Sequence, residues 1–251
     1  MIQKLWKHFL NVLAPQECLL CSCPLDNEAL DNDIYDISQY VCQRCQDCLN
    51  PASSRDTLLS SVTHNLAPDV CRLQHIVARY AYSPVERSFA EPDTLSLSPA
   101  TLLYAIKYHG KKHLARALGR ELGAILRMLG IVQYHYIVPI PIHTVRRRER
   151  GYNQSEHIAY GVADVLSIPV RTSLIYRRAY TLSQTYLSSH ERRNNVRTAF
   201  AVHHHSRSDI NGASLLLIDD ILTTGATLNT CATLLAEHGA QRIDAATVFA
   251  A

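Results

Sequence analysis

The stretch 215–227 reads LLLIDDILTTGAT and combines two adjacent carboxylates with a run of small, hydroxyl-bearing residues. Its four leading apolar residues predict a parallel strand that is buried on both faces. Asp219 and Asp220 come where that strand would end, which is where open α/β sheets bind ligands. The residues after them let backbone N–H groups surround a phosphate at the start of a helix. These residues are Thr223, Thr224, Gly225, Ala226 and Thr227. An ordinary strand–turn–helix with a capping aspartate is the alternative.

Two pairs of cysteines have the spacing of a structural metal site. Cys18 and Cys21 are separated by two residues, and so are Cys42 and Cys45, with twenty residues between the pairs. Four thiolates from two tight turns match the tetrahedral ligand set of structural Zn²⁺, which leaves no open position for catalysis. Cys23 and Cys48 lie close by, so the choice of ligands stays open at this stage.

Basic residues are concentrated in the middle of the chain. The formal net charge of the whole chain is +3, yet residues 101–200 carry 16 basic and 5 acidic side chains. Such a block indicates a polyanionic partner, either a pyrophosphate, a nucleic acid or both. Arg146, Arg148 and Arg150 follow a predicted strand and suit phosphate binding. A solvated basic surface is the alternative.

The elements that must position these residues alternate between strands and helices. Strands are predicted at 76–82, 136–141, 170–175, 215–218 and 243–249. Helices are predicted near 100–106, at 114–129, at 155–166 and at 226–238, where Gly239 provides a C-cap. Residues 50–75 are interpreted as a linker with one short helix. This order predicts an α/β fold with a mainly parallel sheet flanked by helices.

Three segments follow from this division: an N-terminal helix at 2–13 with the four-cysteine zinc module at 1–50, a linker or hood at 51–100, and the α/β domain at 101–251. Length and an apolar fraction of 47% agree with one medium domain and a small module. The chain has no run of 18 apolar residues, so no membrane span is expected. The N-terminus lacks a signal-peptide pattern, so a cytoplasmic location is expected.

The stretch 215–227 resembles the phosphoribosyl-pyrophosphate (PRPP) loop of type I phosphoribosyltransferases. The resemblance implies that Asp219 and Asp220 hold the two ribose hydroxyls, and that residues 223–227 hold the 5′-phosphate. It also implies a pyrophosphate-binding loop after Val138, with Arg146, Arg148 and Arg150 as donors, and Mg²⁺ bound together with PRPP. A segment that closes over PRPP is expected at 178–197.

The whole chain resembles the ComF family, which joins a short zinc module to a phosphoribosyltransferase-type domain. The resemblance covers the paired cysteines, KYHG at 107–110, VPIP at 138–141, RRRERGYNQ at 146–154, QTYLSSHERRNNV at 184–196 and the PRPP loop. It implies a role in natural competence, the uptake and handling of incoming single-stranded DNA in the cytoplasm, with other competence proteins as partners. Basic residues are expected on loops at 107–120 and 146–150. Tyr108 and Tyr152 lie among these charges and are candidates for stacking on unpaired bases.

The acceptor of a phosphoribosyl transfer is the open part of this interpretation. No base-recognition pattern is present, and the chain ends two residues beyond Phe249. Three hypotheses therefore stand together. They are a PRPP- and DNA-binding competence protein, an active phosphoribosyltransferase with an unknown small acceptor, and a PRPP-sensing regulator without catalysis. The fold alone does not separate them.

Overall fold

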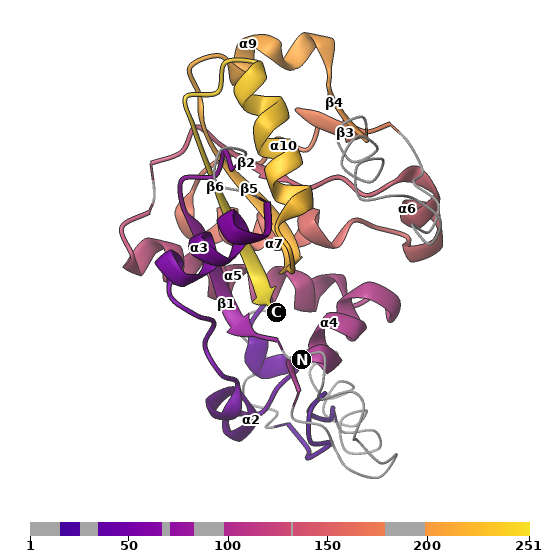
Figure 1. Cartoon of the computed structure of the whole chain (residues 1–251). Coiled ribbons are helices and arrows are strands. Elements are labelled where there is room, and N and C mark those ends of the chain that lie inside the picture. The colour runs from indigo at the N-terminus through magenta and orange to yellow at the C-terminus, as the bar shows by residue number, and fades with distance from the viewer. Residues whose placement is uncertain (1–15, 26–34, 67–70, 83–97, 132, 179–198) are drawn as a thin grey trace, which may run out of the picture.

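The computed structural model describes residues 16–25, 35–66, 71–82, 98–131, 133–178 and 199–251 (Figure 1). A parallel sheet in the order β1-β6-β5-β2 lies at its centre. The strands are β1 (Ile76–Ala81), β6 (Arg242–Ala250), β5 (Ser214–Leu222) and β2 (Tyr136–Pro139). All three neighbouring pairs are parallel, which confirms the predicted α/β fold.

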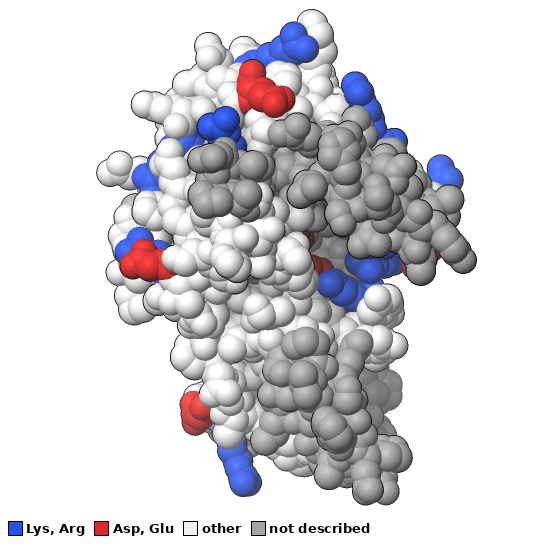
Figure 2. Space-filling model, viewed as in Figure 1, with Lys and Arg blue, Asp and Glu red and all other residues white. Residues whose placement is uncertain are grey.

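The register of β5 places the paired carboxylates beyond its neighbour β2. Pro139, the last residue of β2, pairs with Ile218, so β5 continues past β2 through Asp219 and Asp220 to Leu222. The strand is therefore longer than the predicted 215–218. Figure 2 shows basic and acidic side chains together in a hollow beside this end of the sheet. The carboxyl ends of parallel strands meet there, as ligand binding in such folds requires.

Each face of the sheet is covered by its own hydrophobic core. Leu216 and Ile218 belong to the core that includes α4 (Pro99–Tyr108), α5 (Lys112–Met128) and α7 (Gln154–Leu166). Leu215 and Leu217 belong to the other core, with α3 (Arg55–Leu66) and α10 (Ala226–Glu237). Successive residues of a strand point to opposite faces, so the continuous apolar run fills both cores.

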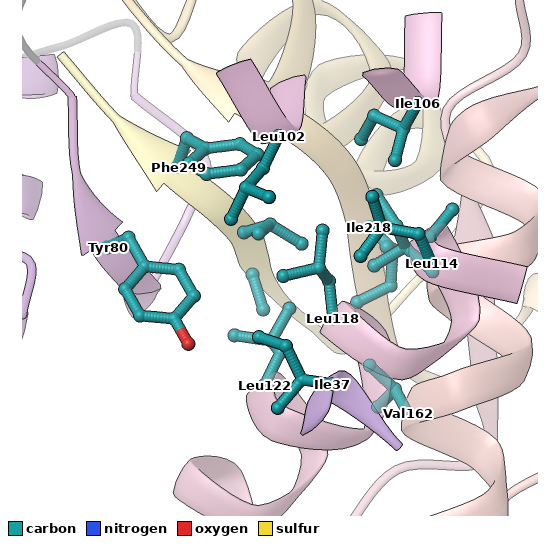
Figure 3. Packing of buried hydrophobic residues seen from close by; sticks show 14 of the residues in the cluster. Ile37, Tyr80, Leu102, Ile106, Leu114, Leu118, Leu122, Val162, Ile218 and Phe249 are labelled. Carbon is teal, nitrogen blue, oxygen red and sulfur yellow. The ribbon is translucent and has the colours of Figure 1, made fainter. Parts of the chain in front are cut away.

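The N-terminal module packs into the first of these cores. It contains the short helix η2 (Ile37–Gln39) and α2 (Gln43–Cys48). Figure 3 shows Ile37 beside Leu118 and Leu122 of α5, on the same side as Tyr80 of β1. The cysteine module and the sheet therefore share buried apolar surface. The division at residues 50 and 100 stays a prediction, although β1 shows that the segment 51–100 contributes an edge strand to the sheet.

Helices α5 and α7 approach each other closely at two glycines. A Cβ atom at Gly119 would overlap the carbonyl oxygen of Ile158, and one at Gly161 would overlap that of Arg116. The absence of side chains at these positions lets the two backbones come together.

Several local expectations were wrong. The predicted loop at 146–150 lies in the helix α6 (Thr144–Arg150), and most of 107–120 lies in α4 and α5. Val170 forms only an isolated bridge with Ile137, and the strand after it, β3 (Ile175–Arg177), pairs antiparallel with β4 (Phe200–Val202) in a separate small sheet. A 3₁₀ turn, η5 (His204–Ser206), and the short helix α9 (Arg207–Ile210) lead into β5. The predicted helix at 2–13 lies outside the described residues. Nearly all of the predicted closing segment at 178–197 does as well. No helix within the described ranges has the length and apolar character to cross a bilayer.

Candidate PRPP site and cysteine cluster

Asp219 and Asp220 are neighbours in sequence but have different surroundings. Asp219 Oδ1 accepts a hydrogen bond from Ser155 Oγ at 3.0 Å and one from the backbone N–H of Asp220 at 2.9 Å. Burial, and then the charge of Asp220, raise the pKa of Asp219 to about 7. Ser155 lies in the first turn of α7, where the Asn153 side chain accepts from the Ser155 N–H and caps the helix. The sequence indicated a helix start at Ser155 but not its contact with Asp219.

Lys107 is the cation that pairs with Asp220. Its Nζ lies 3.1 Å from Asp220 Oδ2, and the two side chains are only 20% and 11% exposed. The strength of such a pair increases as water is excluded from it. Lys107 sits in the last turn of α4 and belongs to the KYHG motif. The sequence interpretation gave Tyr108 of this motif a candidate stacking role, but it predicted no contact between Lys107 and Asp220.

The predicted phosphate loop forms the entry to α10. Gly225 has a left-handed φ of 76° and is the N-cap of this helix, while Thr223 and Thr224 are exposed before it. A Cβ atom at Gly225 would lie 2.6 Å from Val62 Cγ1 of α3, so both the backbone angle and the packing favour glycine. The first N–H groups of a helix have no intrahelical partner, and this twelve-residue helix therefore presents donors to an anion.

A pocket of about 420 Å³ lies between α4 and α6. It is lined by Lys107, Tyr108, Arg146, Glu149 and Arg150. Arg146 and Arg150 are four residues apart and share a face of α6, whereas Arg148 is exposed and outside the lining. Arg147 instead forms a two-pronged ion pair with Glu156 at 3.0 Å. Of the three predicted arginines, only Arg146 and Arg150 thus line the pocket. Lys107 lines the pocket and also pairs with Asp220.

Of the two tyrosines predicted to stack on bases, only Tyr108 is accessible. Tyr108 is 59% exposed, and its ring lies 4.8 Å from that of Tyr104, which is 43% exposed. The guanidinium of Arg150 lies 5.3 Å from the Tyr108 ring. Tyr152 is only 4% exposed, and its hydroxyl donates to the carbonyl oxygen of Ile106, so the stacking role predicted for it is wrong.

The four predicted cysteine ligands come together. The Sγ atoms of Cys18, Cys21, Cys42 and Cys45 all lie within 4.8 Å of one another. Tetrahedral zinc with Zn–S bonds of about 2.3 Å needs sulfur atoms about 3.8 Å apart, so the cluster fits this ion. Backbone N–H groups of Leu20 and Cys42 point to Cys18 Sγ at 3.4 Å.

The two other nearby cysteines differ in position. Cys23 Sγ is 3.1 Å from Cys21 Sγ, at the edge of the cluster, and the exposed Cys48 is not part of it.

Comparisons with known proteins agree with this architecture. Residues 153–251 match the model of the phosphoribosyl transferase domain. Competence protein F of Haemophilus influenzae is 28% identical over 82% of this chain and 77% of its own length. Competence protein ComFC of Bacillus subtilis is 24% identical over 88% of this chain and 89% of its own. DNA utilization protein YhgH of Salmonella typhi is 29% identical over 57% of this chain and 63% of its own, less than two thirds of that relative.

Solved structures show a weaker likeness. The glutamine PRPP amidotransferase from B. subtilis has a TM-score of 0.39 and 19% identity, over 57% of this chain and 30% of that one. A hypoxanthine phosphoribosyltransferase from Staphylococcus aureus has a TM-score of 0.36 and 15% identity, over 56% and 64%. The family assignment rests instead on the matched domain, the competence proteins among the relatives, the parallel sheet and the four-cysteine cluster. Together these findings support a protein of the ComF family with a domain of the phosphoribosyltransferase type.

Proposed function

We propose that this protein binds PRPP and single-stranded DNA in the cytoplasm and acts in natural competence. The observation that carries the proposal is the carboxylate pair at the end of β5, followed by the glycine-capped entry to α10 and adjoined by a cationic pocket. The names of the relatives, competence proteins and DNA utilization proteins, support a competence-related role.

In the proposed complex, each part of PRPP meets chemistry suited to it. Asp219 and Asp220 accept hydrogen bonds from the ribose hydroxyls, and the N–H groups of residues 223–227 hold the 5′-phosphate. Lys107 and Arg146 face the pyrophosphate. Arg148 lies outside the pocket lining, and Arg150 lines the pocket beside the ring of Tyr108, so we assign both weaker contributions to PRPP binding. Mg²⁺ prefers oxygen ligands and would neutralise the pyrophosphate, with the Asp219–Asp220 pair supplying oxygens close by.

The proposed surface for single-stranded DNA is the exposed side of α4 and the start of α5. Tyr104 and Tyr108 offer stacked rings there, and Lys111, Lys112 and Arg150 place positive charge around them. Aromatic rings stack on any base, and cations contact phosphates without reading sequence. Binding with little sequence preference follows from this composition.

A strand-binding experiment tests the proposal. We expect a dye-labelled mixed-sequence single strand to bind in fluorescence anisotropy, with affinity falling steeply between about 50 and about 200 mM salt. Tyr108→Ala should weaken binding by about 1–3 kcal/mol. Tyr160→Ala removes a tyrosine of α7 that is 39% exposed and should have little effect. Equal losses in both variants, or no salt dependence, would place the DNA surface elsewhere.

Two alternatives share the same loop and differ in outcome. An active phosphoribosyltransferase would release pyrophosphate from PRPP when a suitable acceptor is added, so a panel of acceptors identifies it. A PRPP-sensing regulator would bind PRPP but no DNA. Anisotropy measured with and without Mg²⁺ and PRPP separates that regulator from the proposed protein.

A further inference from the structure

The pocket between α4 and α6 has two ends with different chemistry. At the inner end, Lys107 reaches Asp220 at 3.1 Å. Arg146 lines the same pocket as Lys107. At the outer end, the Arg150 guanidinium lies 5.3 Å from the ring of Tyr108, and Glu149 lines the same pocket.

The pocket is larger and more varied in its chemistry than pyrophosphate binding requires. A volume of about 420 Å³ falls within the range typical of small-molecule sites. A pyrophosphate held by Lys107 and Arg146 leaves Tyr108 and Glu149 without a role in PRPP binding. An aromatic ring and a carboxylate are poor partners for phosphate alone, because a carboxylate only accepts hydrogen bonds and repels anions.

The three outer side chains define a ligand with three properties. Arg150 favours an anionic group such as a phosphate, because a guanidinium can donate two parallel hydrogen bonds to it. Tyr108, at 59% exposure, offers ring surface to a planar group. Glu149 requires an N–H donor on that ligand. A nucleobase with an exocyclic amine, attached to a phosphorylated sugar, meets all three requirements.

We propose that this outer end binds a nucleoside monophosphate unit beside PRPP, with its phosphate on Arg150, its base on Tyr108 and its amine on Glu149. The inference rests on the proposed function, because PRPP occupies the inner end. Adenine, cytosine and guanine carry an exocyclic amine, whereas thymine presents carbonyl oxygens on either side of its N–H. The site therefore selects against thymine. The unit is either a free mononucleotide or the phosphorylated end of a strand.

The test uses calorimetry on the full-length protein, first with Mg²⁺ and PRPP and then with added dAMP or dTMP. We expect dAMP to bind to the PRPP-loaded protein, and dTMP to bind about tenfold more weakly. Arg150→Ala should weaken dAMP by about tenfold or more, because a hydrogen bond to a charged group is lost. Arg146→Ala should weaken PRPP more than dAMP. Arg127→Ala, an exposed arginine at the far end of α5, is the matched control and should change neither ligand.

Glu149→Gln gives the sharpest variant, because it preserves size and removes only the charge. The amide both donates and accepts, so the preference for dAMP over dTMP should shrink. Oligonucleotides with a 5′-phosphate are compared with 5′-hydroxyl forms, in order to distinguish a free mononucleotide from the phosphorylated end of a strand as the ligand. A preference for the phosphorylated end identifies a strand terminus, and equal binding with retained dAMP affinity identifies a free mononucleotide.

Three outcomes would overturn the inference, and one separates it from the proposed function. Competition between dAMP and PRPP would make the pocket a single PRPP subsite. An unchanged base preference in Glu149→Gln would remove Glu149 from the site, and PRPP binding without dAMP binding would sink the inference alone. If dAMP binds through Arg150 while PRPP does not bind at all, the proposed function fails and the outer site stands.

Discussion

At the scale of single residues, the two adjacent aspartates have different electrostatic roles. Asp220 has the ammonium of Lys107 at 3.1 Å, whereas Asp219 accepts hydrogen bonds from Ser155 Oγ and a backbone N–H. Burial, and then the charge of Asp220, outweigh these hydrogen bonds and raise the pKa of Asp219 to about 7 from an ordinary value of 3.8. Carboxyl groups with a strongly raised pKa cluster at functional sites, which agrees with the place of Asp219 at the end of β5.

This pKa predicts how stability depends on pH. Between about pH 4 and about pH 7 the folded protein keeps a proton on Asp219 that the unfolded chain has released. The stabilisation that this protonated carboxyl gives the folded wild type is therefore lost as pH rises through that window. Above about pH 7 the contribution of Asp219 to the free energy of unfolding no longer changes with pH. Asp219→Asn removes the titration and preserves size. The thermal midpoints of Asp219→Asn and of the wild type are compared by differential scanning calorimetry without ligand. We expect the midpoint of the variant to rise relative to that of the wild type between about pH 5 and about pH 8. A difference that is constant or that shrinks with pH would contradict the assignment.

At the scale of elements, some parts of the fold follow from sequence pattern and others do not. The strand β5 and the helix α10 are marked by a continuous apolar run, a glycine at the helix entry and Gly239 at its end, so both were predictable. The helix α6 was not, because it has no buried residue and thus no apolar period. Its signals are local instead. The His143 side chain caps its start, and Gly151 ends it with a φ of 76°.

The contact between α5 and α7 predicts an unusual substitution effect. Alanine is normally favoured over glycine within a helix by about 1 kcal/mol. At Gly161 a methyl group would overlap the carbonyl oxygen of Arg116, so the helices would have to separate. We expect Gly161→Ala to lower the free energy of unfolding by about 1–3 kcal/mol in urea titrations.

Gly110→Ala is the control for this effect. Gly110 has a φ of 64°, and no atom lies within 4 Å of the position that an added methyl group would take. Only backbone strain should therefore appear, at about 1–2 kcal/mol. The sign of the change in the free energy of unfolding tests the helix contact itself. A Gly161→Ala protein as stable as the wild type, or more stable, would show that the two helices are not packed as described.

At the scale of the whole molecule, the cysteine module and the α/β domain share one core. Cys18, Leu20 and Ile37 are buried in the same cluster as Leu102 and Leu118. Zinc binding by the module would therefore stabilise the whole protein, because metal binding and folding are coupled. We expect one Zn²⁺ per chain by elemental analysis, and one cooperative thermal transition that shifts down when zinc is chelated.

Substitutions separate the ligands from their neighbours. Cys18→Ser combined with Cys42→Ser should abolish stoichiometric zinc, and Cys48→Ser, an exposed cysteine outside the cluster, should retain it. Cys23→Ser should also retain it if the four clustered thiols are the ligands. Zinc retained in the double variant, or absent from the wild type, would refute the zinc assignment.

Site residues that are adjacent in sequence were predictable, whereas those that only the fold brings together were not. Asp219, Asp220 and residues 223–227 form one continuous stretch, so their order alone indicates their chemistry. Lys107 and Ser155 are far along the chain from the aspartates that they contact, and only the fold brings them together. The same holds for Tyr152, whose burial depends on packing against α4 and is not visible in its basic sequence neighbours.

Calorimetry with Mg²⁺ and PRPP tests the central proposal most directly. The wild type should bind, and Asp220→Asn should bind more weakly by about 1.5–3 kcal/mol, since a hydrogen bond to a charged group is lost. Asp209→Asn, which changes a carboxylate paired with Arg171 outside the site, should bind as the wild type does. The double variant Asp219→Asn with Asp220→Asn should show no measurable binding. A wild type that fails to bind PRPP, or a double variant that binds it equally well, would contradict the proposed function.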